Sequence, residues 1–122
     1  SAASDVYKRQ TLYIDRAQIE QVLINLIKNA KESCGQNTAP QIEVELEQVP
    51  GKVCSLTVRD NGEGILPEVI DKVFVPFFTT KPSGSGIGLS LCKQIMNLHG
   101  GTITVSSEIG KGSCFTLMFP GR

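Results

Sequence analysis

Apolar residues recur at helical spacing in the first quarter of the chain. Between residues 15 and 33 they follow the i, i+3, i+4, i+7 pattern of a helix with one buried face. Asp15 is a preferred N-cap residue, so we expect the helix to begin there, to run to about Ser33 and to end at Gly35 as a C-cap. The residues of the apolar stripe are Ile19, Val22, Leu23, Leu26, Ile27 and Ala30.

A second amphipathic helix is predicted from about Gly88 to Leu98, ended by the glycine pair 100–101. Residues 67–73 suggest a short helix, because proline is favoured in the first helical turn.

Alternating apolar and polar residues predict strands elsewhere in the chain. Residues 42–46 and 53–59 alternate on either side of Pro50-Gly51 and should form an antiparallel hairpin. Further strands are expected at 11–14, 102–106 and 113–119. This order of elements predicts an α+β fold, a two-layer α/β sandwich in which about three helices cover one face of a mixed, mostly antiparallel sheet.

Length and composition indicate a single domain that neither binds nucleic acid nor spans a membrane. A length of 122 residues suits one domain, and 12 basic residues balance 12 acidic ones, which argues against nucleic-acid binding. No apolar run approaches the roughly 20 residues of a membrane span, so we expect no direct membrane contact by this domain. We expect a cytoplasmic location for it, whether or not the parent protein is anchored in a membrane. The four cysteines lack CxxC spacing and are expected to be free thiols.

The first ten residues look foreign to the domain. The codons GAT GTG TAT AAG AGA CAG can encode residues 5–10, and this string resembles the transposon end of a sequencing adapter. We therefore expect residues 1–10 to be a translated, non-native segment and residues 11–122 to be the domain.

Two glycine-containing stretches are the strongest functional signal. Asp60-Asn61-Gly62-Glu63-Gly64-Ile65 places a carboxylate where a strand ends, and Gly84-Ser85-Gly86-Ile87-Gly88-Leu89 leads into a helix. A carboxylate accepts hydrogen bonds, which suits an exocyclic amino group such as that of adenine. A helix start directs free N–H groups at a phosphate. The alternative for Asp60 is an ordinary Asp-Asn-Gly turn.

Two amides on one helix face form a second signal. Asn25 and Asn29 are four residues apart, and the side-chain oxygen of Asn29 is a suitable ligand for Mg²⁺, which prefers hard oxygen donors. The alternative is a pair of polar residues that bridge the helix to its neighbours. Residues 74–81 place aromatic side chains, expected to anchor this segment, before the glycine loop. Lys81 at its end either provides a positive charge for a phosphate or is an ordinary solvated lysine in a loop.

These segments resemble the ATP-binding catalytic domain of sensor histidine kinases, within the superfamily of the Bergerat fold that includes gyrase and heat-shock chaperone ATPases. Residues 25–33 are similar to its asparagine box, 60–65 and 84–89 to its glycine boxes, and 74–81 to its phenylalanine box. The short loop after Phe-Phe-Thr-Thr-Lys most resembles kinases of the nitrogen-regulation type.

The resemblance implies roles for individual residues. Asp60 would bind adenine, Asn29 would bind Mg²⁺ with Asn25 beside the phosphates, and Asn25 and Lys81 would be catalytic. The other residues expected to bind nucleotide are Glu32, Gly62, Gly64, Ile65, Phe78, Thr79, Thr80, Gly84, Ser85, Gly86, Ile87, Gly88, Leu89 and Thr116.

Hydrolytic relatives carry a glutamate where this chain has Asn25, so the resemblance implies an ATP donor rather than a fast ATPase. The acceptor would be a histidine on a separate dimerisation domain, with a response regulator downstream, and the chain should not phosphorylate itself. His99, the single histidine, lies at a helix end and is expected to be structural. The alternatives are a stand-alone serine kinase of the anti-sigma-factor type and a non-enzymatic ATP-gated dimerisation module.

Overall fold

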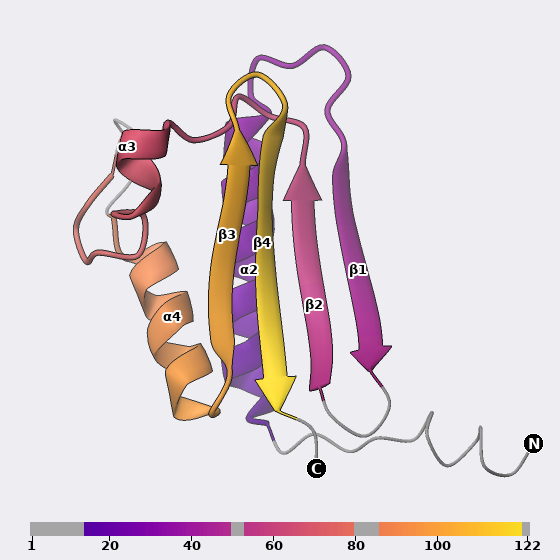
Figure 1. Ribbon diagram of the computed structural model, residues 1–122, viewed down its shortest axis with the longest axis vertical. Helices are drawn as coiled ribbons and strands as arrows, with labels where there is room; N and C mark the ends of the chain where they lie inside the picture. Colours follow the sequence, from indigo (N-terminus) through magenta and orange to yellow (C-terminus); the bar gives the residue numbers. More distant parts are fainter. Residues whose placement is uncertain (1–13, 50–52, 80–85, 121–122) are drawn as a thin grey trace, which may run out of the picture.

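A four-stranded sheet in the order β1-β2-β4-β3 carries two long helices on one face (Figure 1). The computed structural model describes residues 14–49, 53–79 and 86–120. In chain order the elements are α2 (Arg16–Ser33), β1 (Ile42–Val49), β2 (Val53–Asp60), α3 (Pro67–Ile70), α4 (Gly88–Leu98), β3 (Thr102–Glu108) and β4 (Gly112–Pro120).

The expected two-layer α+β architecture is confirmed. All three strand pairings of the described residues are antiparallel. The expected strand at 11–14 falls mainly on residues outside the described part of the chain, and Ile14 itself is not in a strand.

The core lies between the sheet and the two long helices. Its fully buried side chains include Val22 and Leu26 from α2, Cys92 and Met96 from α4, and Phe115 from β4. The apolar stripe predicted for the first helix supplies the α2 half of this layer. Directly paired residues of neighbouring strands share a face, so the row through Val58 and Phe115 faces the helices.

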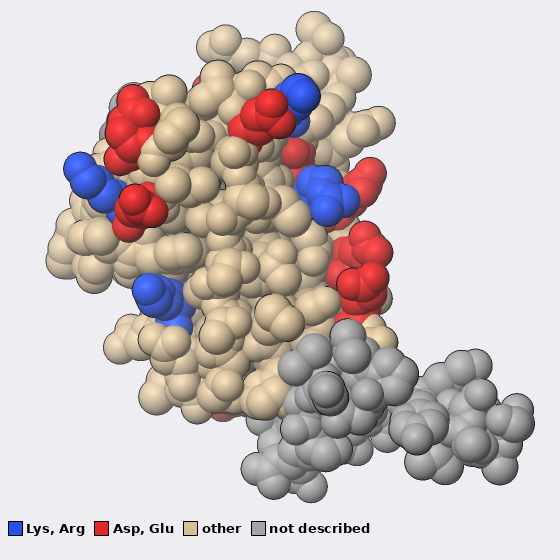
Figure 2. All heavy atoms as spheres, in the orientation of Figure 1, with Lys and Arg blue, Asp and Glu red and all other residues tan. Residues whose placement is uncertain are grey.

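The other face of the sheet has no helix over it in the described part of the chain (Figure 2). Thr57, Thr104 and Thr116 form one row of this open face with Glu45. Acidic side chains gather along β1, where Glu43, Glu45 and Glu47 occupy alternate positions.

Two helix ends differ from expectation. Cys34, rather than Gly35, caps α2, and the Cys34 N–H donates to the Ala30 carbonyl at 3.1 Å. Gly35 does not have the positive φ that is typical of a glycine after a helix. The short helix α3 stops at Ile70 instead of reaching Val73, because the chain continues in tight i→i−3 turns, such as Lys72 N–H to Val69 O at 2.8 Å.

The predicted glycine stop of α4 is confirmed. Gly100 has φ +71° and its N–H donates to the Asn97 carbonyl at 3.0 Å, while the Gly101 N–H donates to the Met96 carbonyl at 2.9 Å. This is the Schellman arrangement, which requires a left-handed residue. None of the described helices is long and apolar enough to cross a bilayer.

Leu26 and Ile24 provide a test of this packing. Leu26 is fully buried, whereas Ile24 on the same helix is 58% exposed. We expect Leu26→Ala to lower the free energy of unfolding by about 2–5 kcal/mol, because it leaves a cavity, and Ile24→Ala to change it by about 0.5 kcal/mol or less. Urea denaturation measures both values, and equal losses would contradict the assigned orientation of α2.

Candidate functional site

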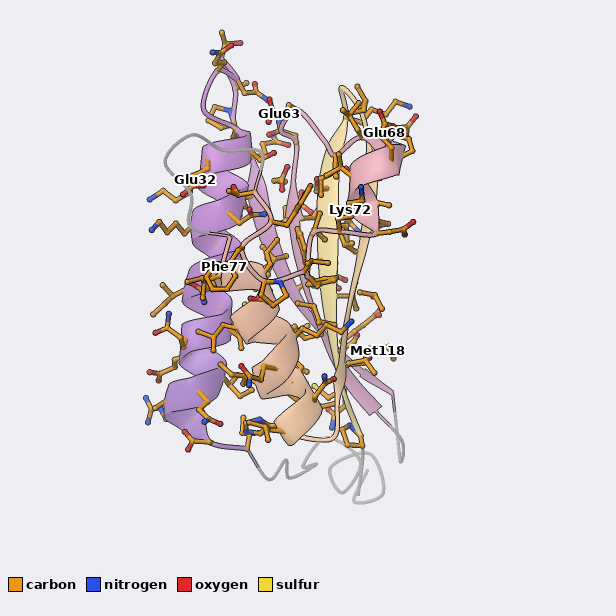
Figure 3. The ribbon with its side chains drawn as sticks, turned by 90° about the vertical axis from the view of Figure 1, so that its left-hand side faces the viewer. Glu32, Glu63, Glu68, Lys72, Phe77 and Met118 are labelled. Atoms are coloured by element: carbon orange, nitrogen blue, oxygen red, sulfur yellow. The ribbon has the colours of Figure 1, made fainter. Side chains whose placement is uncertain are left out.

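A cavity of about 830 Å³ lies between α2, the loop after β2, α3 and the start of α4. Figure 3 views this side of the molecule, with α2 and α3 on either side and with Glu32 and Glu63, which both line the cavity, toward its upper end. The volume falls within the range of small-molecule and cofactor sites.

One face of α2 forms a polar wall of the cavity. The predicted residues Asn25, Asn29 and Glu32 line it, and so do Gln21 and Lys28, which the sequence analysis did not select. Helical spacing could have found both, because residues 21, 25, 28, 29 and 32 recur at intervals of three and four.

Asp60 ends β2 beside Ser113, which lines the cavity, and is only 4% exposed. Its Oδ1 accepts hydrogen bonds from the Gly62 N–H at 2.9 Å and the Ser113 N–H at 3.3 Å. No described residue donates a hydrogen bond to its Oδ2. Asp60 does not itself line the main cavity, but Ser113, its partner in the β2–β4 register, does.

The loop after β2 packs closely against the turn between β3 and β4 at two glycines. A Cβ at Gly64 (φ +81°) would overlap the Glu108 carbonyl oxygen, and one at Gly112 (φ +128°) would overlap the Asp60 carbonyl oxygen. The Gly110 N–H donates to the Glu63 carbonyl at 2.9 Å across this junction. Both glycines are therefore required by close backbone approach.

Gly62 does not line the cavity, but it allows close packing of the loop after β2 against α2. A Cβ there would overlap Ser33, and the Glu63 N–H donates to the Ser33 carbonyl at 3.2 Å. Gly62 thus lets the loop pass directly over the end of α2.

The phenylalanine segment and the second glycine cluster meet at Phe77 and Gly86. Phe77 has a positive φ of 67°, and its N–H donates to the Gly86 carbonyl at 2.8 Å. Phe74 anchors the segment through an edge-to-face contact with Phe115, with 6.2 Å between ring centroids. Of the predicted ligand-binding residues, Gly64, Ile65, Phe78, Thr79, Gly86, Ile87, Gly88 and Leu89 line the cavity.

Four predicted positions, Thr80, Lys81, Gly84 and Ser85, lie outside the described residues. The structure does not bring Thr116 into the cavity lining, because its side chain belongs to the open face of the sheet. Ser113, three residues earlier on the helix-facing side, occupies the position on β4 beside Asp60.

The N-terminus of α4 lies at the cavity. The helix begins at Gly88, which lines the cavity with Ile87 and Leu89, and no side chain caps it. The first N–H groups of a helix lack intrahelical partners, and the helix dipole adds positive potential there. This arrangement favours an anionic ligand group.

Asn25 ties the polar wall to α4. Its amide lies 3.8 Å from the position of a Cβ on Gly88, and it hydrogen-bonds the side chain of Cys92. Burial raises the pKa of the Cys92 thiol to about 11, and the Asn25 hydrogen bond lowers it in part. Asn25 thus has a packing role in addition to its place in the cavity lining.

His99 is structural, as expected. Its Nε2 accepts a hydrogen bond from the Asp15 N–H at 2.9 Å, and its Nδ1 lies 2.8 Å from the Ile95 carbonyl. The neutral tautomer that carries its proton on Nδ1 satisfies both contacts. The ring therefore joins the end of α4 to the start of α2.

The sequence matches the family described as histidine kinase-, DNA gyrase B-, and HSP90-like ATPase over residues 14–122. Sensor histidine kinase ZraS of Escherichia coli is 41% identical over 106 residues, which are 87% of this chain and 22% of that protein. C4-dicarboxylate transport sensor protein DctB of Rhizobium meliloti is 45% identical over 93 residues, 76% of this chain and 15% of that protein. The chain thus spans 22% and 15% of the lengths of these two relatives.

A similar fold is found in the solved catalytic domain of histidine kinase ThkA. The two structures superpose with a TM-score of 0.78 at 37% identity, covering 89% of this chain and 71% of that one.

The buried Cys92 thiol should make the domain less stable at alkaline pH. A native pKa raised from 9.0 to about 11 means that the unfolded chain loses this proton first. The free energy of unfolding should therefore fall as pH rises from about 9 to about 11, by up to about 1.4 kcal/mol per pH unit from this group. Urea unfolding across this range should show a smaller slope for Cys92→Ala than for the wild type, and equal slopes would contradict the assignment.

Proposed function

This chain belongs to the family of histidine kinase-, DNA gyrase B-, and HSP90-like ATPases, and from that premise we propose that it binds Mg-ATP and donates the γ-phosphate to a histidine on a separate domain. The observation that carries the proposal is the buried Asp60 carboxylate, whose Oδ1 is held by two backbone N–H groups. The remaining oxygen, Oδ2, is an acceptor for the amino group of adenine.

The cavity offers suitable surroundings for the rest of the nucleotide. Ile65, Leu66, Val69 and Val73 provide an apolar wall against which a purine can pack. The N-terminus of α4, which has no side-chain cap, supplies N–H donors for phosphate oxygens. Lys28 is the one lysine or arginine among the described residues of the lining.

The donor set of the polar wall fits Mg²⁺ bound together with phosphate. The described residues contain no group of three or more His, Cys, Asp or Glu side chains that could hold a metal. Mg²⁺ commonly takes few protein ligands together with phosphates and waters. Asn29 would hold the ion, with Glu32 nearby on the same face, and the ion would neutralise charge on the phosphates.

Asn25 favours phosphoryl transfer over hydrolysis in this proposal. An amide cannot take a proton from water, and the Asn25 amide is already engaged with Cys92. Phosphoryl transfer depends chiefly on positioning and electrostatic stabilisation, so a site without a water-activating base suits delivery to an external acceptor.

Several finer assignments stay predictions. They are the nucleotide-binding roles of Thr79, Thr80, Gly84 and Ser85, the catalytic role of Lys81, the response regulator as downstream partner, and the likeness to nitrogen-regulation-type kinases. The non-native origin of residues 1–10 also stays a prediction, which an independent read of the parent gene would check.

Asp60→Asn tests the purine subsite with minimal disturbance. The amide retains an oxygen for the Gly62 and Ser113 N–H groups and replaces Oδ2 by an NH₂ group, which opposes the adenine amino group. We expect ATP affinity to fall by about 10- to 100-fold, the size of a lost hydrogen bond to a charged group. Isothermal titration calorimetry measures the change.

Asp71→Asn is the matched control, because it removes the same charge from an exposed turn next to α3. It should leave ATP affinity unchanged. Wild-type affinity in a folded Asp60→Asn protein, or in Asp60→Ala, would overturn the adenine assignment.

Asn29→Asp tests the metal ligand. A carboxylate binds Mg²⁺ more strongly than an amide but repels metal-free phosphate. The Mg²⁺ concentration that half-saturates ATP binding should fall by about three- to tenfold, and ATP binding in EDTA should weaken. The exposed Asn97 on α4 provides the control Asn97→Asp, and identical Mg²⁺ titrations for Asn29→Asp and wild type would refute the role of Asn29.

A further inference from the structure

Three polar residues form one row across the cavity end of the sheet. Asp60 on β2 pairs with Ser113 on β4, and Ser113 pairs with Ser107 on β3. The row lies near the ends of β2 and β3 and the start of β4, which meet at the upper end of the sheet in Figure 1. The burial pattern along β4 puts Ser113 on the side that faces the helices. Ser107 does not line the cavity and was not among the residues selected from the sequence.

The Ser107 hydroxyl joins three separate segments. Its Oγ accepts a hydrogen bond from the Ile65 N–H at 2.7 Å, in the loop after β2. It also lies 2.9 Å from the Gly112 carbonyl oxygen and 2.9 Å from the Ser113 Oγ. These contacts connect the loop, β3 and the start of β4.

The protons of these groups have one arrangement that satisfies every contact. A carbonyl oxygen only accepts, so the single Ser107 proton goes to Gly112. The Ile65 N–H donates to one lone pair of Ser107, and the remaining lone pair is left for Ser113. The Ser113 hydroxyl is therefore the donor in the Ser107–Ser113 hydrogen bond.

This arrangement sets the polarity of the cavity floor. Ser113 is 5% exposed and lines the cavity, and with its proton engaged by Ser107 its Oγ offers only lone pairs to a ligand. The neighbouring Asp60 carboxylate likewise only accepts. Two adjacent acceptors match an amino group, which carries two protons, and repel a carbonyl oxygen in the same place.

We propose that Ser107 is a positioning residue that holds the Ser113 hydroxyl as an acceptor and thereby makes the floor of the cavity select a 6-aminopurine over a 6-oxopurine nucleotide. The proposal rests on the nucleotide-binding function proposed above. In the Ser107→Ala variant the Ser113 hydroxyl has no acceptor on β3, so it can rotate and donate its proton to a 6-oxo group.

The test compares the dissociation constants of ATP and inosine triphosphate (ITP), which replaces the 6-amino group by an oxygen. Calorimetry on the whole chain with Mg²⁺ gives the ITP-to-ATP ratio of dissociation constants for each variant. Ser107→Ala should lower this ratio by about three- to tenfold, the size expected for one net hydrogen bond. Ser107→Thr keeps a hydroxyl and should restore the ratio.

Ser106→Ala is the matched control, because Ser106 lies on the opposite side of the same strand and is exposed. It should leave both dissociation constants unchanged. A parallel loss of ATP and ITP affinity in Ser107→Ala, with an unchanged ratio, would mean that Ser107 only supports the fold and would overturn the proposal.

Ser113→Ala covers the case in which Ser107→Ala does not fold. It removes the acceptor itself and should lower the ratio by a similar factor, so an unchanged ratio there would also overturn the proposal. Failure of the wild type to bind either nucleotide would instead refute the proposed function.

Discussion

The close approach of two backbone segments is the constraint on which the site depends. The loop after β2 meets the turn between β3 and β4 so closely that the carbonyl oxygens of Asp60 and Glu108 occupy the space of a Cβ on Gly112 and Gly64. Only glycine fits such contacts. The approach lets the Ser113 N–H reach the Asp60 carboxylate and the Ile65 N–H reach Ser107, so the floor of the cavity is held from both sides.

The opposite wall of the cavity depends on the contact between α2 and α4. Asn25 lies at this contact, with its amide near Gly88 and hydrogen-bonded to Cys92. The same residue therefore helps to place the N-terminus of α4, whose first residues line the cavity. In the proposed function, one side chain both positions the phosphate-binding helix and leaves the site without a base for water.

Periodicity predicted the elements that are long and amphipathic. The stripe from Ile19 to Ala30 and the glycine stop of α4 were both confirmed. Burial of one helix face requires apolar residues at helical spacing, and a left-handed residue after the helix favours glycine, so both features can be recognised in the sequence. The end of α3 and the cap of α2 were placed wrongly. The end of α3 depends on i→i−3 hydrogen bonds, and the cap of α2 depends on bonds from the Cys34 N–H to the Ala30 and Lys31 carbonyls; no single residue type signals either. Thr116 was expected to bind nucleotide, yet strand register turns it to the open face and brings Ser113 to the cavity instead.

The sequence by itself determined the layered fold, the polar face of α2 and the glycines of the two loops, since each is encoded by local spacing or by a residue with special backbone freedom. Only the tertiary structure decided which residue of the neighbouring strand lies beside Asp60. Asp60 lies 53 residues from Ser113 and 47 from Ser107 in the chain, and antiparallel register makes the three residues one row. Hydrogen-bond polarity within that row is a property of the assembled sheet, because it depends on what each hydroxyl finds across the strand.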